Sequence, residues 1–354
     1  MKQFPAFEGL IEAALDQGLF PGIEVLFARG DELLLHRAYG RTSGSPKASA
    51  LEIGRLFDLA SLTKPLATAL AMMRLVEQGK LYLEQPAYQW LPQWEREETL
   101  SITLLDLLTH RSGLPAWAPL FQQPSREAAW QALLKTPLKV APGAQVIYSC
   151  LNFLLLAEVV RRASGVSLST YCQDQIYRLM GLTDLLFNPG PNHEVLETAH
   201  CPWRQRRLVG EVQDQNAARF DGEGGNAGLF GTAADLFALA RMLLNKGRFE
   251  AGRIFGATTI QRMLANQNQV NLLPRGIGWD VFEPGYGYYS CGDLFSPGSF
   301  GHIGYTGTGL WVDPHEGWVI IHLSHRVWYG AEHQLNEMKA FRPLLHNALI
   351  GEMR

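Results

Sequence analysis

Residues 57–64 contain a serine and a lysine at a spacing that suits nucleophilic catalysis. Ser61 is the only serine of the chain with a lysine three positions later, Lys64, and it lies where a loop meets a long apolar-patterned segment. Residues three apart share one face of a helix, so hydroxyl and amine are expected to meet. A hydroxyl becomes a good nucleophile when a nearby base takes its proton. The pair predicts a serine nucleophile, although a helix cap beside a solvated lysine would give the same short pattern.

Two further segments carry residues that could serve the same reaction. Tyr148 follows a Pro-Gly turn and precedes an apolar helical pattern, so its phenol could project into a cleft; the alternative is a ring that packs at a helix start. His302 lies among glycines at positions 301, 304, 307 and 309. Glycines in a strand allow another backbone or a substrate to approach closely. The alternative for this stretch is a bulged edge strand with a buried histidine.

The elements that must position these residues follow from hydrophobic periodicity. Both chain ends are predicted to supply strands, and the middle of the chain to supply helices. The strand patterns cover residues 22–29, 32–39, 309–312 and 318–324, with a turn at Gly30-Asp31. The helical patterns cover residues 4–15, 62–78, 103–108, 126–135, 152–163, 168–179, 234–244 and 332–350.

This order predicts an α/β fold of the α+β type, with one antiparallel sheet built from both chain ends and flanked by helices. We expect a single catalytic domain of two lobes. Residues 1–60 and 255–354 would form the α/β lobe, and residues 61–254 a mainly helical lobe. A cleft between the lobes would hold the site. The polar, glycine- and proline-rich segments 183–230 and 266–300 are long connections that we expect to shape a pocket.

Composition excludes several classes of protein. The 354 residues are 47% hydrophobic and 18% charged, which excludes a disordered chain. The net charge of −3 is spread along the chain, so no nucleic-acid partner is expected. No apolar run approaches the roughly 18–20 residues of a membrane span, and no membrane partner is expected. Glu8 and Glu12 do not fit a signal-peptide core. The four cysteines form no C-x-x-C pair, so we expect no metal site and a cytoplasmic location.

The three motifs together resemble a known superfamily. Ser61-x-x-Lys64, Tyr148-Ser and His302-x-Gly304, in that order and at these separations, resemble the serine β-lactamases and penicillin-binding proteins. The class C-like branch, with its esterases, D-aminopeptidases and D-Ala-D-Ala carboxypeptidases, is the most similar. Two supporting stretches, 107–114 and 228–236, also resemble this branch, and the similarity runs from about residue 20 to residue 325.

The resemblance implies a β-lactamase/transpeptidase-like fold and an acyl-enzyme mechanism without a cofactor. Ser61 would attack a carbonyl of a small-molecule ester or amide. Lys64 and Tyr148 would share the proton transfers. The backbone N–H groups of Ser61 and Tyr305 would form the oxyanion hole. Gly304 and Trp117 are expected to line the substrate site, and His110 is expected to be structural.

Two departures from the family pattern bear on substrate choice. His302 stands where lactamases of this branch have the lysine of Lys-Thr-Gly, and an ordinary histidine is mostly neutral at pH 7. Cys150 stands at the third position of Tyr-x-Asn, and a thiol binds amides poorly. Both residues are expected to contact substrate and to disfavour β-lactams. If His302 lies against Tyr148, its protonation is expected to alter the acidic limb of the kcat/KM profile.

The sequence thus predicts a serine hydrolase that acts on small esters or amides, with weak or no β-lactamase activity. One alternative is a β-lactamase or D-Ala-D-Ala carboxypeptidase proper. The other alternative is a catalytically silent relative that binds a ligand or a partner. Cys150 is the residue that leaves this alternative open. Gln213 and Asn226 replace histidines that are frequent in related sequences. The acyl group, the leaving group and the oligomeric state are left open.

Overall fold

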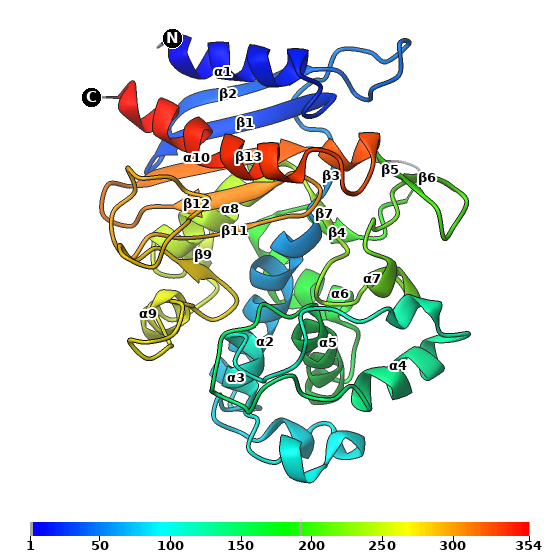
Figure 1. Cartoon of the computed structure of the whole chain (residues 1–354). Coiled ribbons are helices and arrows are strands. Elements are labelled where there is room, and N and C mark those ends of the chain that lie inside the picture. Colours follow the sequence, from blue (N-terminus) through cyan, green and yellow to red (C-terminus); the bar gives the residue numbers. More distant parts are fainter. Residues whose placement is uncertain (1–2, 191–192, 354) are drawn as a thin grey trace.

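A six-stranded antiparallel sheet joins the two ends of the chain (Figure 1). The structure is a computed structural model, and it describes residues 3–190 and 193–353. The strand order is β10-β11-β12-β13-β1-β2. The bounds are β10 Asp280–Val281, β11 Phe300–Ile303, β12 Gly309–Val312, β13 Trp318–Ser324, β1 Gly22–Arg29 and β2 Glu32–Gly40. The predicted sheet, built from both chain ends, is therefore confirmed.

The terminal hairpin and the central pairing fix the register of this sheet. Gly30 has φ +57°, the left-handed conformation that glycine adopts without strain, in the turn between β1 and β2. β1 pairs with β13, with Val25 opposite His322. Strand residues alternate between faces. Val25 and Phe27 accordingly enter one hydrophobic core, and Leu26 enters the other.

Helices from both chain ends cover one face of the sheet, and an internal helix covers the other. α1 (Pro5–Asp16) and α10 (Leu335–Gly351) pack on the first face, and the side chain of Glu352 accepts a hydrogen bond of 2.8 Å from the N–H of Ala6 (Figure 1). α8 (Ala233–Leu244) contacts β13 and β1 on the second face. The Thr232 hydroxyl caps this helix by accepting from the Asp235 N–H.

The middle of the chain folds into helices below the sheet in Figure 1. They are α2 Leu70–Glu77, α3 Leu104–Leu108, α4 Arg126–Leu134, α5 Cys150–Ser164, α6 Leu168–Cys172, α7 Gln215–Arg219 and α9 Ala257–Leu264. Short antiparallel pairings connect them: β3 Phe57–Asp58, β7 Leu229–Gly231 and β4 Leu186–Phe187 in one sheet, β5 Glu197–Cys201 with β6 Arg206–Val209, and β8 Arg248–Phe249 with β9 Gly252–Arg253. The helices α7 and α9 and these small sheets were not predicted.

The predicted single helix over 62–78 is wrong in detail. The chain forms a 3₁₀ turn, η1 (Ala60–Leu62), then a π-helix, η2 (Lys64–Ala69), and only then α2. Side chains from elsewhere bind the carbonyls of η2: the Tyr177 hydroxyl donates to the Leu66 carbonyl at 2.8 Å. Such tertiary contacts are invisible to periodicity, and π-helical turns are frequent at functional sites. The predicted helix over 168–179 is likewise divided, at Gln173–Tyr177.

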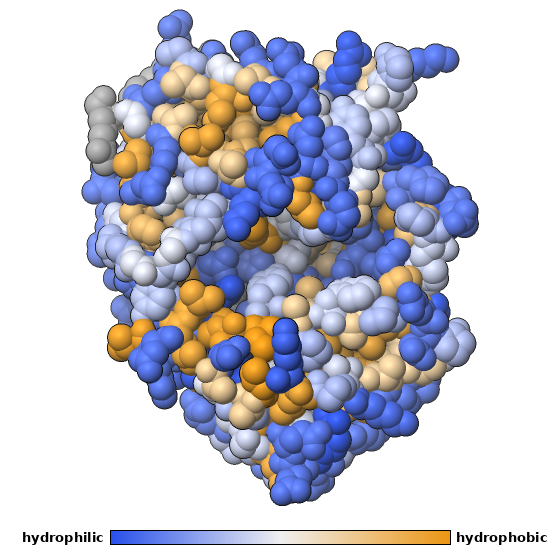
Figure 2. Space-filling model, viewed as in Figure 1, coloured by the Kyte–Doolittle hydropathy of each residue, from blue (hydrophilic) through white to orange (hydrophobic). Residues whose placement is uncertain are grey.

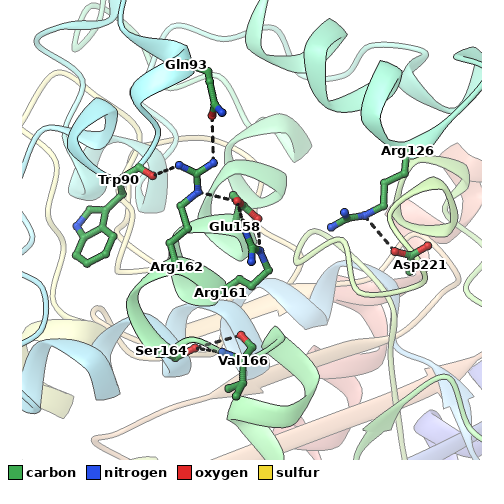
Figure 3. Close-up of polar contacts among 9 residues, drawn as sticks. All are labelled: Trp90, Gln93, Arg126, Glu158, Arg161, Arg162, Ser164, Val166 and Asp221. Atoms are coloured by element: carbon green, nitrogen blue, oxygen red, sulfur yellow. Dashed lines mark hydrogen bonds and ion pairs between the residues drawn. The ribbon is translucent and has the colours of Figure 1, made fainter.

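An ion-pair network anchors the outer end of α5 (Figure 3). Glu158 accepts from Arg161 and from Arg162, each at 2.7 Å. Arg162 also donates to the Trp90 carbonyl at 3.0 Å, which ties the helix to a neighbouring loop. These contacts hold α5 in place, and Tyr148 lies just before the other end of this helix, next to its N-cap Ser149. Within 3–190 and 193–353, no helix is long and apolar enough to cross a membrane.

Candidate active site

Ser61 lies in a tight turn that a buried carboxylate holds in place. Ala60, just before it, has φ +47°, a conformation that costs a non-glycine residue about 1–3 kcal/mol. The Asp58 carboxylate accepts from the Ala60 N–H at 2.8 Å and from the Gln213 N–H at 2.6 Å. Burial raises the pKa of Asp58 to about 6. The strained turn is therefore fixed by β3 and by the loop before α7, and it presents the Ser61 hydroxyl to a cavity.

Lys64 reaches back to Ser61 from the start of η2. Its Nζ donates to the Ser61 Oγ and to the Asn226 carbonyl, both at 2.9 Å, and its side chain is fully buried. Burial lowers the pKa of Lys64, but the electrostatic influence of Cys150 and Tyr148 raises it by a larger amount. The net pKa therefore lies above the usual value for lysine. The direction of this shift favours the ammonium form of Lys64, which donates to the Ser61 oxygen.

Tyr148 is positioned by His110, which acts on both of its neighbours. The His110 carbonyl accepts from the Ile147 N–H and the His110 Nδ1 accepts from the Ser149 N–H, both at 2.9 Å. The His110 ring also faces the Tyr148 ring, with centroids 4.6 Å apart. Because Nδ1 accepts, Nε2 carries the proton. Burial, together with nearby cations, keeps the pKa of His110 well below its usual value. The structural role that was expected of His110 is thus to hold the segment around Tyr148.

The turn between β11 and β12 lies directly against the nucleophile segment. The Thr306 hydroxyl donates to the Asp58 carbonyl at 2.8 Å. A Cβ on Gly304 would lie 2.6 Å from the Leu59 carbonyl oxygen, so only glycine permits this approach. Among the described residues, none accepts a hydrogen bond from the Tyr305 N–H. The close approach that the glycine pattern predicted is observed here.

His302 lies against Tyr148 and is held neutral. The two ring centroids are 5.7 Å apart. The His302 Nδ1 donates to the Ile303 carbonyl at 2.8 Å, which leaves Nε2 without a proton. Burial, with Lys64 and Arg275 as neighbouring cations, lowers the pKa of His302 well below 6.5. The expectation that its protonation shapes the acidic limb of the kcat/KM profile is therefore corrected: the ring stays neutral through the range where ordinary histidines titrate.

Two cavities meet at Ser61, Tyr148 and Tyr305, which line both. The first has a volume of about 450 Å³ and includes His302 and Gly304. The second has a volume of about 560 Å³ and includes Trp117 and Cys150. Figure 2 shows the surface hollowed across the middle of this face. The structure thus brings all eight candidate residues to one place, with Lys64 buried behind Ser61.

The wall of the first cavity also contains charged residues that the sequence analysis did not single out. They are Arg275, Asp280, Arg326, Lys339 and Arg342. Isolated charged residues carry no motif, so no sequence signal identified them beyond the expectation that residues 266–300 shape a pocket. Tyr288 from that segment lines this cavity, whereas Tyr286 and Tyr289 line a smaller one of about 150 Å³. Gln213 lines the second cavity, and the Asn226 carbonyl binds Lys64.

No metal centre is visible among the side chains that the structure describes. Within 3–190 and 193–353, no group of three or more His, Cys, Asp or Glu residues could hold a metal ion. The four cysteines are unpaired thiols in this part of the chain. The arrangement of Ser61, Lys64 and Tyr148 fits a nucleophilic centre, because a hydroxyl, an amine and a phenol converge there.

Comparisons with known proteins agree with this geometry. The family model described as "Beta-lactamase" matches residues 7–341. A protein of Escherichia coli (strain K12) named "Putative D-alanyl-D-alanine carboxypeptidase" is 28% identical over 355 residues, covering 89% of this chain and 80% of the relative. Two solved structures share the fold at 20% sequence identity. The hydrolase EstCE1 has a TM-score of 0.76 and covers 97% of this chain and 98% of its own. A penicillin-binding protein homologue from Caulobacter crescentus has a TM-score of 0.77, with 99% and 97% covered.

Proposed function

The chain belongs to the β-lactamase family of serine hydrolases, and we propose that it cleaves small esters or amides through an acyl-enzyme, with weak or no β-lactamase activity. The observation that carries the proposal is the contact of 2.9 Å between the Lys64 Nζ and the Ser61 Oγ, at the junction of two cavities that Tyr148 and Tyr305 also line. A nucleophile, a cation, a phenol and a free backbone donor at one point are what acyl transfer needs.

In the proposed acylation step, Tyr148 enters as its phenolate and accepts the proton of Ser61. The raised pKa of Lys64 favours its ammonium form, which stabilises the phenolate before the transfer and the negative charge that develops on Oγ during it. The bond from Oγ to the carbonyl carbon forms, and the carbonyl oxygen becomes an oxyanion. The bond to the leaving group then breaks, and Tyr148 returns the proton to that group. Water repeats the sequence at the ester of Ser61 and releases the acid.

The oxyanion would be bound by the backbone N–H groups of Ser61 and Tyr305. The hydroxyls of Thr306 and Thr308 hold the Tyr305 turn against the nucleophile segment, with Thr308 donating to the Leu59 carbonyl at 3.1 Å. Donors fixed in this way need no reorganisation when the charge develops. A rigid pair of backbone donors supports hydrolysis of esters and activated amides in general, so the substrate must be selected elsewhere in the cavities.

Weak β-lactamase activity is proposed because the position of the usual lysine carries a neutral ring. His302 offers no positive charge to a β-lactam carboxylate, since its pKa is lowered well below 6.5 by burial and by neighbouring cations. Cys150, which lines the second cavity, offers only a thiol where an amide would serve a peptide-like substrate. Both features favour esters over lactams.

A D-Ala-D-Ala carboxypeptidase is the second candidate, and one structural feature favours it. Arg326, Lys339 and Arg342 line the first cavity, and this cationic wall could bind a terminal carboxylate. The Escherichia coli relative also carries that name.

Activity profiling with an active-site label tests the proposal. We expect fast hydrolysis of p-nitrophenyl acetate, slow or no turnover of a chromogenic cephalosporin, and a single adduct on Ser61 by intact mass after treatment with a fluorophosphonate. Release of D-alanine from a D-Ala-D-Ala peptide faster than ester cleavage would favour the carboxypeptidase. A wild-type protein without an adduct would contradict the proposal and favour the silent, ligand-binding alternative.

Gly304→Ala is expected to lower kcat/KM for ester hydrolysis by about 100-fold, the usual effect of losing one oxyanion donor. The new methyl group would meet the Leu59 carbonyl and the Thr308 hydroxyl and push the Tyr305 turn away from Ser61. Gly9→Ala is the matched control, because nothing lies within 4 Å of a Cβ there. Initial rates on p-nitrophenyl acetate measure the effect, and a Gly304→Ala variant as active as Gly9→Ala would remove this turn from the mechanism.

A further inference from the structure

Arg275 places a second cation beside the phenol of Tyr148. The central guanidinium carbon of Arg275 lies 5.6 Å from the centroid of the Tyr148 ring, and the Lys64 Nζ lies 4.9 Å from it. Arg275 comes from the loop between α9 and β10, far in sequence from both other residues. It lines the same cavity as Ser61 and Tyr148. Two positive charges therefore face one phenol from independent parts of the chain.

The backbone and side chain of Arg275 are both held in place. Its carbonyl accepts from the Gln267 N–H at 2.7 Å, and its N–H donates to the Asn266 side chain at 3.1 Å. Its guanidinium pairs with Asp280, and only 15% of the side chain is exposed. A charge that is fixed and mostly shielded from water acts more strongly on its neighbours than a mobile surface charge.

The other groups around Tyr148 do not replace this charge. The titratable groups around the phenol are Lys64 of η2, His110 after α3, His302 of β11 and Arg275 itself. Asp280 of β10 is paired with Arg275, and Cys150 of α5 lines a cavity together with Tyr148. Both histidines are held neutral. Burial is the main cause of the low pKa of His110 and of His302, and Arg275 contributes to each, so its field extends across the whole cluster.

We infer that Arg275 is a positioning residue for catalysis, which stabilises the phenolate of Tyr148 so that it can take the Ser61 proton, and that Asp280 sets the strength of this effect. The inference rests on the proposed function, in which Tyr148 is the proton acceptor. A positive charge near a phenolate favours the charged form, and the paired carboxylate partly offsets it. Removing Arg275 must therefore move the acidic limb of the rate profile in the direction opposite to removing Asp280.

The test measures the second-order rate constant for labelling of Ser61 by a fluorophosphonate between pH 5 and pH 9. In this reaction the Oγ–P bond forms, the P–F bond breaks, fluoride leaves, and Tyr148 takes the serine proton. The label reports activation of the nucleophile without any knowledge of the substrate. The proteins compared are the wild type, Arg275→Gln, Arg275→Lys and Asp280→Asn, each with its thermal unfolding curve.

For Arg275→Gln we expect the acidic limb of the rate profile to move to higher pH by about one unit, with a loss of about tenfold at neutral pH that largely disappears above the limb. Arg275→Lys keeps the charge and should retain the wild-type limb. Asp280→Asn should move the limb to lower pH. A uniform loss at every pH in Arg275→Gln would overturn the inference, because a merely structural role acts in that way.

The two proposals fail in different ways. Wild-type protein that is never labelled on Ser61 would overturn the proposed function together with this inference. Wild-type labelling with an unshifted limb in Arg275→Gln would overturn the inference alone. If Arg275→Gln does not fold, Asp280→Asn decides: a limb moved to lower pH supports the inference, and an unmoved limb overturns it.

Discussion

Ser61→Ala is expected to lower kcat/KM for p-nitrophenyl acetate by about 10⁴-fold or more and to abolish the fluorophosphonate adduct. Alanine has no oxygen to attack the carbonyl, and the remaining oxyanion donors cannot form an acyl-enzyme. Lys64 would lose one of its two hydrogen-bond acceptors but would keep the Asn226 carbonyl, so the variant should still fold. Initial rates and intact mass measure the two effects.

Ser101→Ala is the matched control, since Ser101 lies on the exposed surface before α3. It should hydrolyse esters and label like the wild type. If Ser61→Ala kept more than about one hundredth of wild-type activity, another nucleophile would have to be sought. An adduct of equal yield on Ser61→Ala and on the wild type would have the same meaning.

The free energy of unfolding is expected to fall by more than about 1 kcal/mol between pH 7.5 and pH 5. Five histidines are buried with lowered pKa values, caused first by burial: His110, His302, His322, His325 and His346. The pKa is about 4 for His325 and about 3 for His346. In the unfolded chain each would titrate near 6.5, so their stabilising effect is present above that pH and is lost as the pH falls.

The size of this effect follows from linkage. At pH 5 His325 and His346 each cost about 2 kcal/mol, so together they cost about 4 kcal/mol. His110, His302 and His322 add to this loss, because their pKa values are lowered in the same direction. Burial also raises the pKa of Asp58 and of Asp235 to about 6. Protonation of these two carboxyls in the folded state opposes the loss and returns about 3 kcal/mol. His325 and His346 alone outweigh this return, and the other three histidines increase the loss, so stability falls as the pH falls.

Urea unfolding at the two pH values measures this difference. His346→Phe is the matched variant, because it removes one titrating ring from the core beside Phe295 and His322. It should flatten the pH dependence by about 2 kcal/mol. Equal stability of the wild type at pH 7.5 and pH 5 would contradict the argument, as would an unchanged slope in His346→Phe.

The neutral state of His302 and the charged state of Lys64 jointly define what the site can do. In the proposed mechanism, a cation that donates to Ser61 and a neutral ring beside Tyr148 leave the phenol as the group that transfers protons. They also leave recognition of any substrate carboxylate to the residues of the cationic wall, Arg326, Lys339 and Arg342. The substrate profile and the Arg275 variants therefore examine separate parts of one site.

The sequence by itself determined the local features. The hairpin at Gly30, the spacing of Ser61 and Lys64, and the glycine at 304 follow from periodicity, helical spacing and backbone conformation, which act over a few residues. The order of the three motifs was enough to indicate the family, and the pattern of strands at both chain ends was enough to predict the central sheet. These inferences needed no knowledge of which distant residues touch.

Only the tertiary structure decided the electrostatics of the site. Arg275 faces Tyr148, His110 fixes the segment around it, and His302 stays neutral because of contacts between separate elements. Arg275 and His302 each lie more than a hundred residues from Tyr148 in the sequence. The π-helical turn after Lys64 has the same origin, because side chains from distant helices bind its carbonyls. The charge state of a group depends on its burial and on the sum of the neighbouring charges. Folding creates both by bringing together segments that are far apart in the sequence, and the pattern of a single segment does not reveal them.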